Sequence, residues 1–357
     1  MQPKAGIREG FCSRGFARLA LAALFYFVLS AQSIAQTDTS KKFDHRYYES
    51  YTDMVTSRVY FSQKYTSLRI KADEPVRDLE YRPNTTLNLG VGATYGWFTL
   101  NLAYGFSFLN RADNPKGKTK YLDLQSHIYT RKMSIDLFGQ LYKGFYAFPK
   151  RIVPQDRDLY YVRPDVKMRH WGGAAYYIYN WKKFSLRAAM LQNEWQKKSA
   201  GSLLLGAEFY FGTNSGDSAL VPRILENNYQ QSGVIKTRYF DIGPGIGYAY
   251  TVVVDEHFYG TAGVTVSFPF SFHKQWRYGV TEKRITISPD VLSRVGVGYN
   301  SDRINVSVIW VNSSVQTKND HGSYSIRTGN VRFNAAYRLE AGPKLKKKLK
   351  FFETRQP

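Results

Sequence analysis

Segment after segment of this 357-residue chain alternates apolar and polar side chains with a period of two. In residues 258–272, phenylalanine, valine, alanine and glycine occupy one parity from Phe258 to Phe272. Threonine, glycine and serine occupy the other parity from Thr261 to Ser267. Successive side chains of a β-strand point to opposite faces, so the pattern predicts strands with one apolar face. Comparable alternation marks 87–95, 98–108, 121–129, 133–141, 184–190, 203–211, 240–252, 291–299, 304–310 and 331–339.

Charged residues respect this parity. In all of these segments Lys, Arg, Asp and Glu are absent from the apolar face. A lipid-facing Lys or Arg at the bilayer midplane costs about 2–4 kcal/mol, and a closed barrel pairs every backbone polar group within the hydrocarbon. The alternative, a soluble β-sandwich, also alternates but rarely needs so many aromatic faces. We therefore predict an all-β fold, an antiparallel transmembrane β-barrel.

The number of strands is less clearly indicated. The less regular segments 54–70 and 166–179 are also expected to be strands, which gives thirteen candidates. Short turns, such as Asn180-Trp181, alternate with longer loops near 72–84, 110–118, 147–165, 273–284 and 317–323, as expected of a barrel. Bacterial barrels of this kind have an even number of strands, so thirteen is one too many or one too few. The discrepancy lies at 212–235, because the expected strands before and after this segment would run in the same direction. Either residues 217–235 hide a strand, or residues 219–227 form a short helix that crosses the lumen. We predict 12–14 strands within 54–340.

The first 35 residues are typical of a cleavable signal peptide. Basic residues precede an apolar run, Leu19–Ser30, and Ser33-Ile34-Ala35 supplies small residues before the expected cleavage. The alternative, a single transmembrane helix, needs about 20 apolar residues. The single cysteine, Cys12, lies within this leader, so the mature chain is expected to lack thiol chemistry. We divide the chain into a signal peptide 1–35, a periplasmic segment 36–53, the barrel 54–340 and a basic tail 341–357.

The formal net charge of +22 indicates anionic partners. An exported chain meets no nucleic acid in its own compartment, so we expect outer-membrane lipids and lipopolysaccharide phosphates instead. The barrel-assembly machinery is a further expected partner. Because the chain continues past 331–339, that strand is expected to substitute for a C-terminal assembly signal. The expected location is the outer membrane of a Gram-negative bacterium.

Several segments resemble a known family. They are YRPNTTLNLGVGATYGW (81–97), KGKTKYLDLQSHIYTRK (116–132), DLFGQLYKGFY (136–146) and KKSAGSLLLG (197–206). Together the chain resembles a family of Bacteroidota outer-membrane β-barrels known only as a domain of unknown function. The resemblance covers essentially the whole mature chain and implies an outer-membrane barrel. It implies no activity and no catalytic residues.

The residues at the alternate positions, opposite the lipid-facing ones, are predicted to face the interior of the barrel. These positions gather polar side chains that either line a charged pore or fill a narrow barrel with a structural network of ion pairs and hydrogen bonds. We favour the structural network because barrels much smaller than porins need not hold an open channel. The predicted lumen network comprises Asp123, Gln125, His127, Asp136, Gln140, Arg187, Glu208, Asp241, Arg294 and Arg332.

An enzymatic interior is the alternative, since Asp123 and His127 are expected on one strand and Asp136 on the next. Acyl-transfer chemistry also needs a nucleophile beside the base, and Ser126 lies on the wrong parity. We therefore assign no catalytic residues and expect no enzyme. The six histidines lack metal-ligand spacing, so we expect neither a metal nor a cofactor.

Two basic surface segments are candidates for contact with anionic lipid. One is the 150–169 region, with Arg151 and Arg157, and the other is the tail, with Lys346, Lys347 and Lys348. In both cases the alternative is a solvated basic segment. The overall prediction is an outer-membrane barrel with a structural or passive-transport role. An envelope-lipid-modifying barrel enzyme and a surface protein that binds anionic glycolipid remain the alternatives.

Overall fold

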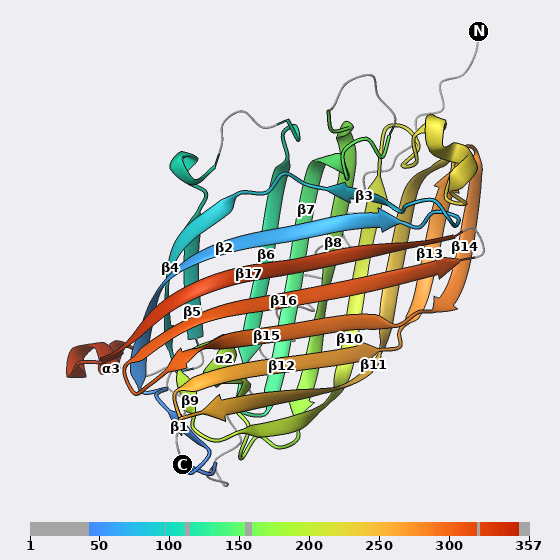
Figure 1. Ribbon diagram of the computed structural model, residues 1–357. Helices are drawn as coiled ribbons and strands as arrows, with labels where there is room; N and C mark the ends of the chain where they lie inside the picture. The colour runs from blue at the N-terminus through green and yellow to red at the C-terminus, as the bar shows by residue number, and fades with distance from the viewer. Residues whose placement is uncertain (1–42, 97, 111–114, 154–158, 320–321, 350–357) are drawn as a thin grey trace. The chain divides into compact units, whose positions relative to one another are not determined.

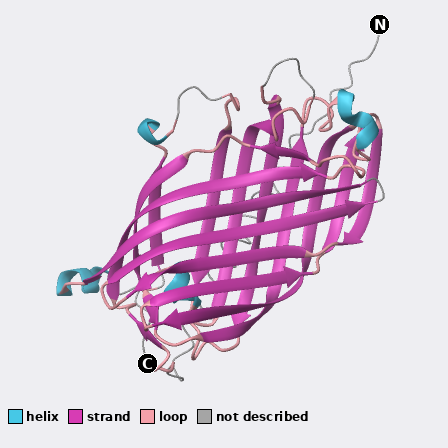
Figure 2. Cartoon of the chain, in the orientation of Figure 1, coloured by secondary structure: helices cyan, strands magenta, loops and turns pink. Residues whose placement is uncertain are grey.

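The computed structural model describes residues 43–96, 98–110, 115–153, 159–319 and 322–349. In this part of the chain, fifteen strands form one antiparallel sheet that curves round into a barrel, and two more form a small separate sheet (Figures 1 and 2). The predicted signal peptide 1–35 lies outside the described residues. Among those that are described, no helix has both the length and the apolar composition needed to cross a membrane.

The strands follow one another up and down the wall. The first half of the barrel contains β2 (Met54–Ile70), β3 (Leu79–Arg82), β4 (Leu87–Tyr95), β5 (Phe98–Tyr104), β6 (Lys120–Tyr129), β7 (Met133–Phe148) and β8 (Val162–Ile178). The second half contains β10 (Ala200–Ser215), β11 (Val234–Val254), β12 (Phe258–Ser267), β13 (Phe270–Arg277), β14 (Val280–Ile287), β15 (Asp290–Asn300), β16 (Ile304–Asn319) and β17 (Gly322–Glu340).

The hydrogen-bonded ring closes through ten strands, in the order β2, β3, β7, β8, β10, β11, β12, β15, β16 and β17, with β17 paired to β2. Strands β3 and β4 pair successively with β2, and β12 and β13 pair successively with β11. Counting β3–β4, β12–β13 and β14–β15 each as one pass, the described chain crosses the wall twelve times. The antiparallel barrel is therefore confirmed, with an even number of passes.

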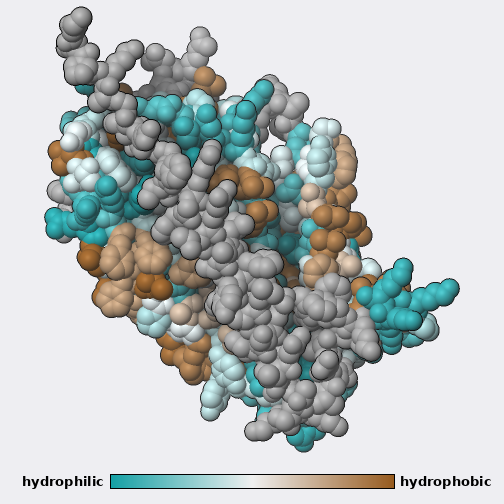
Figure 3. Space-filling view, turned by 180° about the vertical axis from the view of Figure 1, so that it is seen from behind, coloured by the Kyte–Doolittle hydropathy of each residue, from teal (hydrophilic) through white to brown (hydrophobic). Residues whose placement is uncertain are grey.

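Exposure confirms the predicted faces. On β12, Val264 is 48% exposed whereas the next residue, Thr265, is fully buried. On β11, Ile246 and Tyr248 are exposed by 50% and 55%, whereas Asp241 is fully buried. Figure 3 shows apolar side chains gathered on the flanks of the wall and hydrophilic ones towards its upper rim. Apolar side chains thus cover the outer surface and polar ones lie inside, as a transmembrane barrel requires.

The predicted strand 184–190 is wrong. Residues 179–199 leave the wall after β8 and contain helix α2 (Leu186–Met190) and strand β9 (Glu194–Gln196), which pairs with β1 (Tyr48–Ser50). All five residues of α2 are buried, so its alternation does not separate two environments. Asn180-Trp181 is consequently not a tight turn between two wall strands.

Removing that strand resolves the conflict at 212–235. Strands β10 and β11 are direct antiparallel neighbours, joined by residues 216–233. This connection contains a 3-10 helix, η2 (Arg223–Asn228), and neither a hidden strand nor a lumen-crossing link is needed.

Two expected loops also differ. Residues 273–284 belong mostly to the β13–β14 hairpin, whose turn contains Gly279 at φ +80°. Strands β16 and β17 extend to 319 and 322, so the expected loop 317–323 is a short connection. A short 3-10 helix, η1 (Ser107–Leu109), follows β5. The start of the basic tail forms an exposed helix, α3 (Pro343–Leu349).

Candidate functional site

Polar side chains fill the interior and contact one another across it. Among the predicted network residues, Asp136, Gln140, Arg187, Glu208, Asp241 and Arg294 are at most 2% exposed. Asp123, Gln125, His127 and Arg332 are partly buried. Nine of the ten lie on wall strands, and Arg187 lies on α2 instead of the expected strand.

The first cluster surrounds Asp136 on β7. Its carboxylate accepts hydrogen bonds from Tyr129 at 3.0 Å and Ser134 at 3.4 Å, and it forms a buried ion pair with Arg294 of β15. His127 Nδ1 lies 2.5 Å from Asp136 Oδ1. Because β7 and β15 are not neighbours in the sheet, the ion pair crosses the interior. This cluster braces opposite walls of the barrel.

A second cluster surrounds Asp123 on β6. Tyr142 and Gln140 donate to its Oδ2 at 2.5 and 2.7 Å, and Lys64 Nζ lies 3.5 Å from Oδ1. Gln140 in turn accepts from the Thr328 hydroxyl of β17 at 3.0 Å. A single hydrogen-bonded chain thus connects β2, β6, β7 and β17.

A third group of carboxylates is less well paired. Glu208 accepts from Tyr176 at 2.5 Å and from Ser267 at 3.1 Å. Among the described residues, the carboxylate of Asp241 has no hydrogen-bond partner, and its closest cationic candidate is His273, 4.0 Å away. Glu208 therefore belongs to a hydrogen-bonded group, whereas Asp241 does not.

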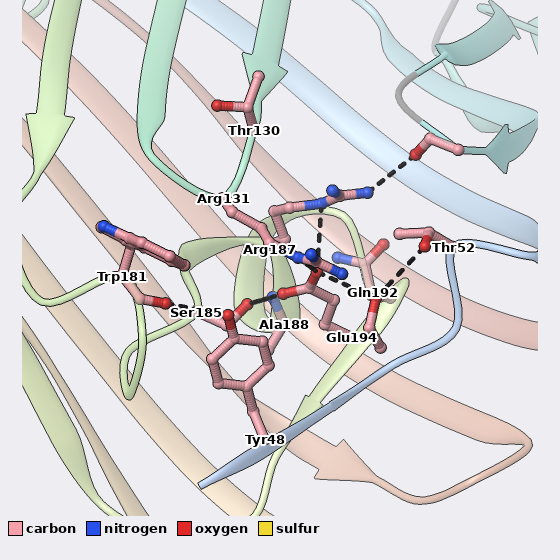
Figure 4. A network of polar contacts seen from close by, with 12 residues as sticks. Tyr48, Thr52, Thr130, Arg131, Trp181, Ser185, Arg187, Ala188, Gln192 and Glu194 are labelled. Atoms are coloured by element: carbon pink, nitrogen blue, oxygen red, sulfur yellow. Dashed lines mark hydrogen bonds and ion pairs between the residues drawn. The ribbon is translucent and has the colours of Figure 1, made fainter. Parts of the chain in front are cut away.

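The insertion 179–199 fills the end of the barrel where β1 and α3 lie. Leu186, Ala189 and Met190 of α2 pack in one buried cluster with lumenal residues such as Leu292 and Ile309. Figure 4 shows Glu194 of β9 between Arg131 and Arg187, whose Nε atoms lie 4.0 and 3.8 Å from its carboxylate. Ser185 also donates to Glu194. We call residues 179–199 together with β1 the plug.

Main-chain contacts attach the plug to the wall. Arg187 donates to the carbonyl of Gly96 at 2.8 Å, and Arg338 donates to the carbonyl of Gln192 at 2.7 Å. Within the plug, the Tyr48 hydroxyl donates to the carbonyl of Trp181 at 2.9 Å. Burial raises the pKa of Tyr48 above its ordinary value, and the negative charge of Glu194 adds to this shift. Burial likewise lowers the pKa of the Arg187 guanidinium.

The connection between β10 and β11 covers the other end. Leu220, Val221 and Leu225 belong to one buried cluster with lumenal residues such as Tyr142 and Tyr239. Tyr81 donates to the carbonyl of Leu220 at 2.7 Å, and Arg163 donates to that of Ala219 at 2.9 Å. We call residues 216–233 the cap. The barrel interior is therefore packed from both ends by its own chain.

The interior contains a candidate base. His127 and Asp136 form a pair in which the carboxylate could orient the imidazole as a base. In the described part of the chain, no serine, threonine or cysteine side chain hydrogen-bonds to His127. The described residues also hold no group of three or more His, Cys, Asp or Glu side chains suited to a metal ion. Among the described residues, the pair therefore supplies a candidate base with no hydroxyl or thiol bonded to its imidazole.

The predicted surface contacts have different surroundings. Arg151 is exposed and has a positive φ of 62°, while Arg157 lies outside the described residues. Lys346, Lys347 and Lys348 are exposed on α3. Arg163, in the same basic region, is buried and paired with Asp165 at 2.7 Å. The basic patch near 150–169 is thus smaller than the sequence indicates.

Sequence reasoning missed several interior residues. Arg58, Lys64, Arg131, Glu194 and Arg338 all have partly or fully buried polar contacts. Arg58 and Lys64 lie on β2, where a parity count extended along 54–70 would have found them, and Arg338 has the polar parity of the predicted strand 331–339. Glu194 has no such signal because it lies on the plug.

The comparisons with solved structures return bacterial outer-membrane barrels. The outer-membrane protease OmpT of Escherichia coli shares 10% identity over 82% of this chain and 98% of its own, with a TM-score of 0.36. OmpT of Vibrio cholerae shares 10% identity over 78% of this chain and 98% of its own, with a TM-score of 0.26. The toluene transporter TodX of Pseudomonas putida shares 6% sequence identity over 81% of this chain and 90% of its own, with a TM-score of 0.23.

No curated protein matches the sequence. A family model described as a domain of unknown function matches residues 42–339, which span the plug and the barrel together. The resemblance to a family known only as a domain of unknown function is thereby confirmed. The chain belongs to the DUF4421 family, a domain of unknown function that here folds as an antiparallel β-barrel.

Proposed function

We propose that this protein is a non-conducting structural barrel of the Gram-negative outer membrane. Residues 1–35 would direct its export as a signal peptide and then be cleaved. The observation that supports the non-conducting barrel is the packing of the interior from both ends. The plug places α2 among lumenal side chains, and the cap buries Leu220 and Val221 at the opposite end. Ion pairs such as Arg294–Asp136 cross the space between them. A diffusion pore of the porin kind would require this space to hold water.

Conductance in planar bilayers tests the proposal. The purified full chain should insert without stepwise ion currents. Replacing residues 181–198 by a short Gly-Ser linker removes α2 and β9 while keeping β8 and β10, and should produce steps. The matched control deletes α3, which lies outside the barrel, and this variant should show no stepwise ion currents. Stepwise currents from the intact chain would reject the sealed barrel in favour of passive transport.

A second candidate function is contact with anionic envelope lipids through α3. Lys346, Lys347 and Lys348 are exposed on this helix directly after the last wall strand, where basic side chains attract anionic head groups. Replacing all three by Gln should weaken binding of the chain to anionic vesicles at low salt. Equal binding of the two proteins would remove α3 from consideration. Lipopolysaccharide, through the basic 150–169 region, and the barrel-assembly machinery, through the last strand β17, remain proposed partners.

A further inference from the structure

The described wall of the barrel has a break in its hydrogen bonding between β5 and β6. Strand β5 pairs with β4 alone, and β6 pairs with β7 alone, so the facing edges of β5 and β6 are unpaired in the described structure. Beyond the break the ring is closed by β3, which pairs with both β2 and β7 (Figure 1). Lipid hydrocarbon cannot satisfy open strand edges. The break therefore calls for an occupant that can form hydrogen bonds.

Both ends of the break are held by side chains. At one end Lys64 of β2 reaches across to β6 and donates to the main-chain carbonyl of Asp123 at 2.8 Å. At the other end Arg187 of the plug binds the Gly96 carbonyl beside β5, while Arg131, just beyond β6, lies 4.0 Å from Glu194. The break is thus a bounded slot between fixed ends. We call it the β5–β6 slot.

The slot is polar within an apolar wall. On β5, Asn101 and Ala103 have the inward parity and yet are exposed. The outward residues beside the slot are apolar, with Leu102 on β5 exposed by 61% and Leu124 on β6 by 55%. Unpaired strand edges flanked by lipid-facing leucines suit an amphiphile whose chains stay in the bilayer and whose polar head group meets the wall.

Two cationic side chains behind the slot have no acidic partner in the described chain. Arg58 of β2 is 3% exposed and donates to the Leu191 carbonyl at 3.0 Å and to Thr94, whereas its Nε and Nη1 have no hydrogen-bond partner there. Arg332, on the neighbouring strand β17, lies over the ring of Tyr60 at 4.9 Å, and its Nε is also unpartnered. The two arginines also act on each other as like charges. A buried charge without a partner is unfavourable.

The arginines and the slot are contiguous. A Cβ placed on Gly92 of β4 would overlap the Asn101 side-chain oxygen and lie 3.2 Å from Arg58 Cγ. Gly92 therefore allows the Arg58 side chain and Asn101 to come together. Only a residue without a side chain fits between them.

We propose that the β5–β6 slot binds the phosphate-bearing head group of an anionic membrane lipid, with Arg58 and Arg332 as its phosphate ligands. Guanidinium groups bind phosphate through charge-assisted, paired hydrogen bonds. The free donors of the two arginines match the acceptor oxygens of a phosphate, and the flanking leucines contact the acyl chains. This proposal rests on the membrane placement of the barrel and is independent of whether the lumen conducts.

Titration of the purified full chain with short-chain phosphatidylglycerol, alongside inorganic phosphate, tests the proposal. Replacing both arginines, R58Q and R332Q, should weaken lipid binding about tenfold or more, because hydrogen bonds to charged groups are among the stronger ones. The matched control is Arg327→Gln, which removes an exposed charge of β17 on the opposite parity and should leave the affinity unchanged. Unchanged affinity in the double variant would overturn the proposal. Inorganic phosphate that binds as tightly as the lipid would overturn its lipid part.

Two further variants separate binding from folding. Arg332→Gln alone keeps the buried Arg58 and should still weaken binding, with folding checked by the heat-dependent mobility of the barrel on electrophoresis. Asn101→Cys in a Cys12→Ser background places a thiol at the slot, and a bulky maleimide there should block the lipid. The same label at Val264→Cys, on the lipid-facing surface of β12, should not. A label at 101 that leaves lipid binding intact would exclude the slot as the site.

Discussion

Arg294 on β15 and Asp136 on β7 form an ion pair between strands that are not neighbours in the sheet. Both side chains are at most 1% exposed, and the carboxylate also accepts from Tyr129 and Ser134. The pair therefore fixes the distance between two walls of the barrel. The hydrogen bonds of the sheet itself do not do so, because they join adjacent strands.

Removing Arg294 should destabilise the barrel strongly. Arg294→Gln leaves the Asp136 charge buried without its cation, and breaking a buried pair in this way costs about 3–5 kcal/mol. The double variant R294Q and D136N should recover part of the loss because no uncompensated charge remains. The control Arg303→Gln, in an exposed pair with Glu340, should leave stability unchanged. Urea unfolding in lipid vesicles measures all three, and an equal effect of Arg294→Gln and Arg303→Gln would contradict the prediction.

The barrel could be predicted because each strand carries its own signal. One lipid-facing and one interior face impose alternation on residues such as Val264 and Thr265 without reference to any other strand. Strand β14 lacked this signal because Thr281, Lys283 and Arg284 are exposed there and need no apolar face. Alternation is required only where one face meets lipid and the other does not.

The plug was misread for a physical reason. Phe184, Leu186, Ala188 and Met190 alternate with other residues over a segment too short to distinguish period two from a helical turn. A sequence signal was nevertheless present, since Ser185 precedes the helix and accepts from the Ala188 N–H at 3.0 Å as an N-cap. The partners of Glu194 and Arg187 are set by how the plug docks. No spacing along the chain determines them.

A charge on the outer surface should report the membrane environment by its depth. Val264 lies within β12 and is 48% exposed, whereas Ile304 begins β16 beside a turn and is 46% exposed. Val264→Arg should cost about 2–4 kcal/mol in a bilayer and Ile304→Arg about 0–1 kcal/mol, because the penalty falls towards the interface. Denaturant titration of both variants in vesicles gives the difference. Equal costs would indicate that these surfaces do not face hydrocarbon.

Gly245 on β11 should tolerate no larger side chain. A Cβ there would overlap the Tyr176 hydroxyl, which donates to Glu208 at 2.5 Å. Gly245→Val should displace Tyr176 from Glu208 and cost about 1–3 kcal/mol through overpacking. Gly260→Ala is the control because no described atom lies within 4 Å of the position that its Cβ would take. Thermal unfolding of the two variants should separate them, and a stable Gly245→Val protein would show that Tyr176 can move.

The plug should loosen at alkaline pH through Tyr48. Its hydroxyl donates to the Trp181 carbonyl, and burial raises its pKa above the ordinary value near 10. A raised pKa in the folded state means that the associated stability is complete below the unfolded pKa. That stability is lost as the pH rises above it, since the unfolded state then releases the proton first. Hydrogen exchange of the α2 and β9 amides should therefore accelerate above about pH 10 by more than intrinsic exchange requires. Tyr48→Phe should remove this extra acceleration, although it starts from a less protected plug because the bond to Trp181 is gone. An identical pH profile in the two proteins would assign the loosening to another group.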